Sequence, residues 1–255
     1  MFSKPVRVTI LLLLLAFVAA SSWLTRQRTT RWEIPLWAVV YPINGDGSEL
    51  ARQHIATLTP HTFAAIETFF SEEAARYGLP IERPVEIKLA PPIGELPPAP
   101  PADGNMFKIV AWSLQMRWWA WRHNSFDGPV DLKLYVIYHT PQPGVALPHS
   151  LGLQKGLIGV AHIFADPRQD QTNNVVISHE LLHLVGASDK YEPATNQPRY
   201  PEGYAEPELT PLLPQRFAEL MGGRIPVTET KAAIPPTLDS VLIGELTAKE
   251  IRWIK

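Results

Sequence analysis

The chain has 255 residues, of which 45% are hydrophobic and 19% are charged, a composition typical of a globular protein with a buried core. It contains no cysteine, which excludes disulfide frameworks, thiolate zinc sites and cysteine nucleophiles. Any metal site must therefore use imidazole and carboxylate ligands. The formal net charge is −2, but residues 1–31 carry five basic and no acidic residues, so the remainder has a net charge of −7, which excludes a general nucleic-acid surface.

The N-terminus carries an uncharged run of 18 residues from Val8 to Thr25, preceded by Lys4 and Arg7. Such a run can just cross a bilayer core of roughly 30 Å. It also fits a secretory signal peptide with a cleavage site near Ala20, and a buried core helix is a third alternative. The length of the run, and Trp23 at its end, favour a membrane anchor. We therefore expect residues 1–31 to be an anchor or signal peptide with a basic flank. Residues 32–255 should form one domain outside the cytoplasm, either tethered to the membrane or secreted.

The first elements expected in this domain are a strand and two helices. Residues 37–41 read as a short strand that ends at Pro42 and the following Asn44–Gly47 turn. Residues 49–77 have apolar residues at helical spacing, with Pro60 splitting them into two helices and Gly78 ending the second. Residues 85–89 alternate as a strand does. Six prolines in residues 91–102 then predict an extended surface loop within the domain.

The second half should begin with a tryptophan-rich helix over residues 105–123. Its tryptophans recur at helical spacing, which favours packing in the core over stacking on a ligand: Trp112, Trp118, Trp119 and Trp121. Strands are expected at residues 130–138 and 157–164, and a helix from residue 172 or 173 to 185. A loop rich in proline leads to a last helix over residues 238–254.

The expected helix ending at residue 185 contains His179, Glu180 and His183 in the pattern HELLH. Residues four apart share one face of a helix, so both imidazoles can bind one zinc ion. Glu180 lies one position on, placed to take a proton from a metal-bound water rather than to ligate. Gly186 can end the helix in a left-handed conformation and turn the chain so that Asp189 returns to the metal. Two imidazoles and one carboxylate leave a fourth zinc position for water.

The sequence HELLHLVGASD resembles the metzincin signature HExxHxxGxxH, in the variant with aspartate as third ligand found in snapalysin-like peptidases. The resemblance implies an α/β (α+β) domain with a small twisted mixed sheet, an active-site helix and an irregular C-terminal subdomain that closes the cleft. It also implies a methionine turn beneath the metal, for which Met221 is the candidate; Gly223 stands where some family members carry an extra tyrosine ligand. The strand over residues 156–164 would then be an edge strand that pairs with extended substrate.

We therefore expect a zinc-dependent endopeptidase that acts on a peptide or protein substrate, with Glu180 as general base. Two other functions remain open: a non-catalytic, membrane-anchored binding module that retains the metal, and a zinc amidase acting on a cell-wall amide. His179 and His183 could alternatively be surface residues or part of a closed structural zinc site. Asp189 could be an ordinary turn residue and Met221 a packing residue. A later glutamate would then be the third ligand, and the available ones are Glu202, Glu206, Glu208 and Glu219.

Overall fold

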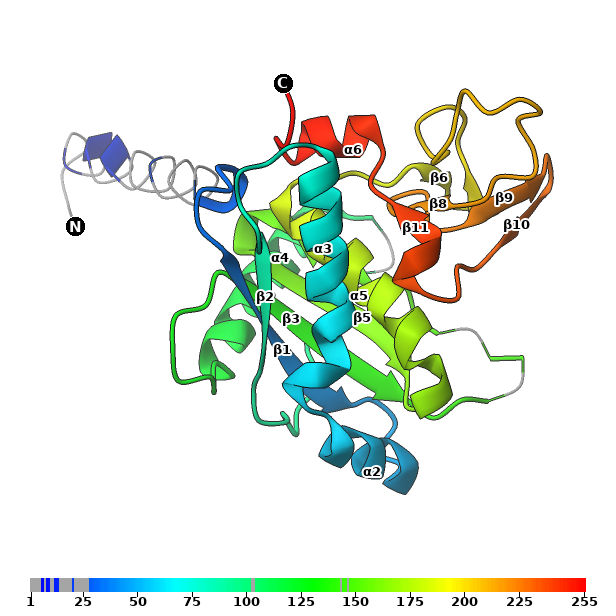
Figure 1. Cartoon of the computed structure of the whole chain (residues 1–255). Coiled ribbons are helices and arrows are strands. Elements are labelled where there is room, and N and C mark those ends of the chain that lie inside the picture. The colour runs from blue at the N-terminus through cyan, green and yellow to red at the C-terminus, as the bar shows by residue number, and fades with distance from the viewer. Residues whose placement is uncertain are drawn as a thin grey trace.

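The structure is a computed structural model that describes residues 28–101, 104–142, 144–145 and 147–255, together with six isolated positions before residue 21. At its centre is a mixed sheet of five strands in the order β2-β1-β3-β5-β4 (Figure 1). The strands are β1 (Leu36–Asn44), β2 (Val85–Leu89), β3 (Leu132–His139), β4 (Leu151–Leu153) and β5 (Ile158–Phe164). β4 runs antiparallel to β5, and the other pairs are parallel.

Helices cover both faces of the sheet. The longer ones are α2 (Glu49–Thr57), α3 (Ala64–Arg76), α4 (Met106–Arg122) and α5 (Asp170–Val185). Along β1 successive side chains alternate between two cores: Ala38 and Val40 join the core under α3 and α5, whereas Val39 and Tyr41 join the core under α4. A near-continuous apolar strand is the pattern of a sheet buried on both faces, so the molecule has three layers with α4 opposite α3 and α5.

After α5 the chain forms short strands and loops. Three two-stranded pairs follow: β6 (Tyr191–Glu192) with β7 (Gln197–Pro198), β9 (Ile225–Thr228) with β10 (Lys231–Ala233), and β8 (Ala218–Glu219) with β11 (Val241–Leu242). The last helix, α6, spans Glu245–Glu250. Short 3₁₀ turns lie at η1 (Pro60–Phe63), η2 (Gln154–Gly156), η3 (Pro167–Gln169) and η4 (Leu238–Ser240).

Most of the predicted elements are confirmed with small shifts at their ends. The predicted end of the first strand, the single last helix and the edge position of the strand before α5 are wrong. β1 continues through Pro42 to Asn44. Pro42 faces the β2 side of β1, where its carbonyl accepts from the Ile93 N–H. The pairing of β1 with β2 has already ended at Leu89, so the N–H that proline lacks would have had no strand partner there. The expected last helix is interrupted by β11, because Leu242 O accepts the N–H of Leu220 after β8. The strand before α5, β5, is internal, and the edge strand is β4.

The tryptophan-rich helix also differs from its prediction. Trp119 is buried and Trp112 is partly buried, with its indole N–H donating to Pro98 O at 2.8 Å. Trp118 and Trp121, however, are exposed, so the expectation of core packing is wrong for these two residues. α4 meets the sheet along one face only, and nothing among the described residues covers the opposite face.

No helix among the described residues is both long enough and apolar enough to span a bilayer. The expected anchor or signal peptide falls almost entirely on residues that lie outside the described part of the chain.

Candidate metal centre

The C-terminal end of α5 brings the two histidines to one side of the helix. His179 and His183 lie one turn apart with ring centroids 4.7 Å from each other. The helix ends at Gly186, whose φ of 114° confirms the predicted helix-ending glycine. A β-carbon at residue 186 would also lie 2.8 Å from Gln154 Nε2. The positive φ is what requires glycine here, because the Gln154 amide is the end of a flexible side chain and can move aside.

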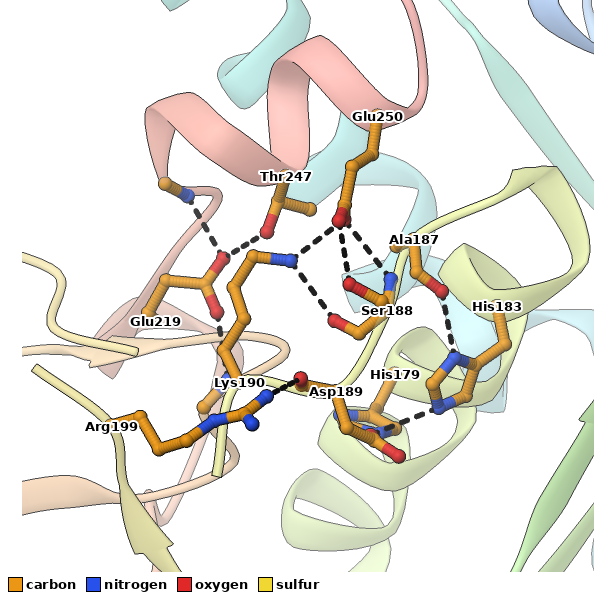
Figure 2. Close-up of polar contacts among 12 residues, drawn as sticks. His179, His183, Ala187, Ser188, Asp189, Lys190, Arg199, Glu219, Thr247 and Glu250 are labelled. Atoms are coloured by element: carbon orange, nitrogen blue, oxygen red, sulfur yellow. Dashed lines mark hydrogen bonds and ion pairs between the residues drawn. The ribbon is translucent and has the colours of Figure 1, made fainter. Parts of the chain in front are cut away.

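The turn after Gly186 brings Asp189 to both imidazoles. Its Oδ1 lies 3.1 Å from His179 Nε2 and 3.2 Å from His183 Nε2 (Figure 2). Ligand atoms around one tetrahedral zinc ion are separated by about 3.3 Å, since Zn–N and Zn–O distances are near 2.0 Å. His179, Glu180 and His183 form a group that could hold a metal ion, with ligand atoms within 4.8 Å of one another. Asp189 adds a fourth donor atom, its Oδ1, against the same two rings.

The outer nitrogens of both rings are held by backbone carbonyls. His179 Nδ1 lies 2.9 Å from Leu220 O, and His183 Nδ1 lies 3.0 Å from Ala187 O. A carbonyl can only accept, so each Nδ1 carries a proton, and in the neutral form of each ring the Nε2 lone pair is directed at the carboxylate of Asp189. Two lone pairs and an anionic oxygen repel one another unless a cation lies between them. The donor set therefore fits a divalent metal ion.

The charged groups of the cluster raise the pKa of His179 and lower that of Asp189, and both shifts favour the charged forms. Burial opposes protonation of His179, but its hydrogen bond to Asp189 and the charge of Glu180 outweigh burial and raise its pKa. Burial alone would raise the pKa of Asp189, yet the contacts with His179 and His183 hold that pKa well below its usual range. The pocket therefore favours a carboxylate anion beside positive charge, which a bound metal cation would also supply.

Glu180 is buried beside the two rings, and its Oε2 has no hydrogen-bond partner in the described part of the chain. Burial raises the pKa of Glu180, opposed by the neighbouring histidines. An unpartnered buried carboxylate oxygen costs free energy unless water or a ligand meets it. Glu180 therefore presents a buried carboxylate oxygen that water or a ligand could meet, beside the two imidazoles.

Glu250 of α6 holds the turn that carries Asp189 (Figure 2). Its carboxylate accepts from the Ser188 N–H at 3.0 Å and from the buried Lys190 ammonium at 2.7 Å. The Lys190 ammonium also donates to Ser188 O at 2.9 Å, and Arg199 donates to Asp189 O at 2.5 Å. The position of the Asp189 carboxylate therefore depends on a contact with the C-terminal helix, about sixty residues further along the chain.

Met221 lies in a tight turn directly after β8. The N–H groups of Gly222 and Gly223 both donate to Glu219 O at 3.0 Å, and Met221 is fully buried. The buried side chain of Glu219 accepts from Gly222 N–H at 2.7 Å and from the Thr247 hydroxyl at 2.6 Å. Leu220 in this turn supplies the carbonyl that binds His179 Nδ1, so the turn helps to position the candidate metal centre.

The four glutamates considered as alternative third ligands form other contacts. Glu219 holds the turn just described, and Glu206 pairs with Arg216. Glu202 and Glu208 line a cavity beside α6. Among the described residues, Asp189 is the member of this set of five carboxylates whose oxygen lies 3.1 and 3.2 Å from His179 and His183.

Sequence reasoning missed Tyr191 and the pocket beside His179. The ring of Tyr191 lies 6.2 Å from that of His179, and burial, then the charges of Asp189 and Glu180, raise the pKa of its hydroxyl to about 12. It lines a pocket of about 170 Å³ with Val175, Val176, His179, Asn196, Leu220, Gly222, Gly223 and Arg224. Tyr191 follows Asp189 by two residues, the one signal that could have found it. Two larger cavities, of about 440 and 700 Å³, share no lining residue with it.

β4 lies against the other side of the metal centre. A β-carbon at Gly152 would be 2.5 Å from His183 Cβ, so the edge strand and α5 touch through a glycine. β4 pairs with β5 on one side only, which leaves the outer side of its backbone without a strand partner in the described sheet. Backbone donors and acceptors are thus available next to the two imidazoles.

Comparisons with known proteins give little further information. No family model matches the sequence, and no curated protein matches it. Among solved structures, the crystal structure of wild-type OgpA from Akkermansia muciniphila has 13% sequence identity and a TM-score of 0.39, over 84% of this chain. This chain spans 58% of the length of that protein. A likeness this weak carries no argument about function, so the residues themselves must carry the functional conclusion.

Proposed function

We propose that the chain is a zinc-dependent endopeptidase of the metzincin kind. The observation that carries the proposal is the convergence of two imidazole Nε2 atoms and Asp189 Oδ1, with both Nδ1 atoms bound to carbonyls. Two histidines and one carboxylate are the donor set of catalytic zinc, and they leave one coordination position open. When bound, zinc would polarise the scissile carbonyl and acidify the attacking water.

Glu180 supplies the proton chemistry. Its unpartnered Oε2 can accept a proton from the attacking water and then deliver it to the leaving amine. The raised pKa of Glu180 suits both steps, because the group must be basic enough to take the proton and acidic enough to return it. A structural zinc site would need no such carboxylate beside the ion.

The surroundings of the metal centre fit a peptide substrate. An extended peptide could add to the free side of β4 through backbone hydrogen bonds, as strand-addition recognition requires. The pocket of about 170 Å³ beside His179 could hold one substrate side chain. Its walls combine the apolar side chains of Val175, Val176 and Leu220 with the polar groups of Tyr191, Asn196 and Arg224.

The experiment is a comparison of the full chain with Glu180→Gln. We expect both proteins to bind one zinc per chain by elemental analysis, and only the unsubstituted chain to cleave casein. Loss of rate should be at least about 100-fold, the usual lower range for removing a general base. Failure to bind zinc would overturn the metal assignment. Zinc binding with equal inertness of both proteins towards a broad peptide library would favour the binding module, and turnover of muropeptides alone would favour the amidase.

A further inference from the structure

The outward face of α4 is apolar along its whole length. Phe107 is 86% exposed, Trp121 is 72% exposed and Leu114 is 59% exposed. The exposed apolar stripe of α4 consists of Met106, Phe107, Val110, Leu114, Trp118 and Trp121. Residues 106, 110, 114, 118 and 121 are spaced by four, four, four and three positions, so they share one side of the helix. Met116, Trp119 and Ala120 occupy the other side, against the sheet.

A helix that is apolar on all sides is normally buried on all sides. α4 is buried on one side only, and an exposed apolar stripe of this length marks a docking surface. Its composition indicates the occupant. The 17 residues of α4 include Lys108, Arg117 and Arg122 and no acidic residue. Arg122 lies over the ring of Trp118, 4.8 Å from its centroid. Exposed tryptophans flanked by basic residues are typical of helices that lie in the headgroup region of a bilayer.

The position of α4 supports the same occupant. Arg28 is paired with Asp131 at 2.6 Å, and Asp131 directly precedes β3, the strand that follows α4 in the chain. The uncharged run of residues 8–25 ends three residues before Arg28. The chain therefore enters the fold at the end of the sheet where β3 begins. The C-terminal end of α4, which carries Trp118 and Trp121, lies at the same end.

We propose that the exposed apolar stripe of α4 lies in the interface of an anionic lipid bilayer and is a second membrane contact beside the N-terminal segment. α4 and α5 cover opposite faces of the sheet (Figure 1), so this contact turns the helix with His179 and His183 away from the lipid. The metal centre then faces the aqueous side, where peripheral and soluble substrates reach it.

The test uses the full chain with single cysteines, which is direct because the chain has none of its own. Leu114→Cys and Trp121→Cys carry a nitroxide on the stripe, and Glu72→Cys on α3 is the matched control on the opposite face. The labelled chains are incorporated into vesicles of phosphatidylcholine with a minority of phosphatidylglycerol. Collision rates with oxygen, which concentrates in lipid, and with a water-soluble nickel chelate are measured by electron paramagnetic resonance.

We expect the oxygen-to-nickel ratio at residues 114 and 121 to exceed that at residue 72 several-fold, and the excess to fall when phosphatidylglycerol is omitted. Equal ratios at all three positions would overturn the proposal. Low collision rates with both reagents at residues 114 and 121 would show that protein covers the stripe, which also overturns it. In that case, spectra that sharpen on dilution with unlabelled chain identify a second copy as the occupant, and unchanged spectra identify the chain's own N-terminal segment.

Discussion

At the residue scale, the metal centre depends on the tautomers of two histidines. Leu220 O and Ala187 O each bind an Nδ1 and so direct both Nε2 lone pairs to one point. Asp189 Oδ1 lies at the same point, half-exposed and held through the turn around it. Each of the three donors is therefore positioned by a backbone contact rather than by chance side-chain proximity.

Removal of the Asp189 carboxylate, the candidate third ligand, should lower the metal affinity strongly. We expect Asp189→Ala to weaken zinc binding by more than the roughly 10–100-fold that loss of an outer-shell partner costs. Competition with a chromophoric chelator measures the dissociation constant, and Glu202→Ala is the control with the same loss of charge. If Glu202→Ala weakened binding as much as Asp189→Ala, Asp189 would not be the ligand.

The close contact between β4 and α5 gives a second prediction. Gly152→Ala would place a methyl group 2.5 Å from His183 Cβ, a separation that atoms do not tolerate. The edge strand must move away from the helix, so peptide cleavage should fall at least about tenfold with zinc still bound. Gly94→Ala, where a β-carbon would meet nothing within 4 Å, should keep full activity. Equal activity of the two variants would show that β4 does not position substrate.

At the element scale, α6 controls the turn that carries Asp189. Burial would raise the pKa of Glu250, but hydrogen bonds from Lys190 and Ser188 outweigh burial and lower it below the ordinary value of 4.5. A carboxylate with a lowered folded-state pKa stabilises the fold above its unfolded-state pKa. That contribution is lost as the pH falls from 4.5 through the folded-state pKa.

We therefore expect Glu250→Gln to be less stable than the unsubstituted chain at neutral pH and the difference to close below pH 4.5. Chemical denaturation at several pH values, with a chelator present so that metal release does not contribute, measures this difference. Glu245→Gln, on the exposed side of the same helix, is the matched control: it loses an ion pair with Lys249 that solvent screens, so its gap should be much smaller. A gap that stays constant with pH would mean that the carboxylate charge of Glu250 is not what holds the turn.

At the scale of the whole molecule, the metal centre joins two parts of the chain. His179 and His183 belong to α5, which packs on the sheet, whereas Leu220 and Asp189 belong to the irregular C-terminal part. A ligand that binds only the folded chain stabilises it by about 2.7 kcal/mol at a hundredfold excess over the dissociation constant. Zinc should therefore raise the melting temperature of the whole domain.

Calorimetry with and without zinc tests this expectation. We expect a rise of about 5–11 °C, because each kcal/mol shifts the melting temperature of a domain of this size by about 2–4 °C and zinc contributes about 2.7 kcal/mol. His183→Ala should show no rise, because one imidazole donor is missing. A rise of equal size in His183→Ala would place the stabilising zinc elsewhere on the chain.

The local features of this protein could be predicted from its amino-acid sequence. HELLH on a helix placed two imidazoles on one side, and Gly186 predicted the helix end, because 3.6 residues per turn and the freedom of glycine act within a few residues. The alternation and helical spacing of apolar residues likewise predicted β2, α3, α4 and α5, since these patterns reflect which side of an element is buried.

Contacts between groups far apart in the chain could not be predicted in this way and are known from the folded structure. Glu250 reaching Ser188, Leu220 O reaching His179, the edge position of β4 and the exposure of Trp118 and Trp121 depend on contacts between segments far apart in the chain. Helical spacing shows that a side of a helix is apolar but not what covers it, so the two sides of α4 look alike in the sequence. Which side meets the sheet is fixed by the packing of the whole molecule, because burying one side against β1 and β3 leaves the other to solvent or to a partner.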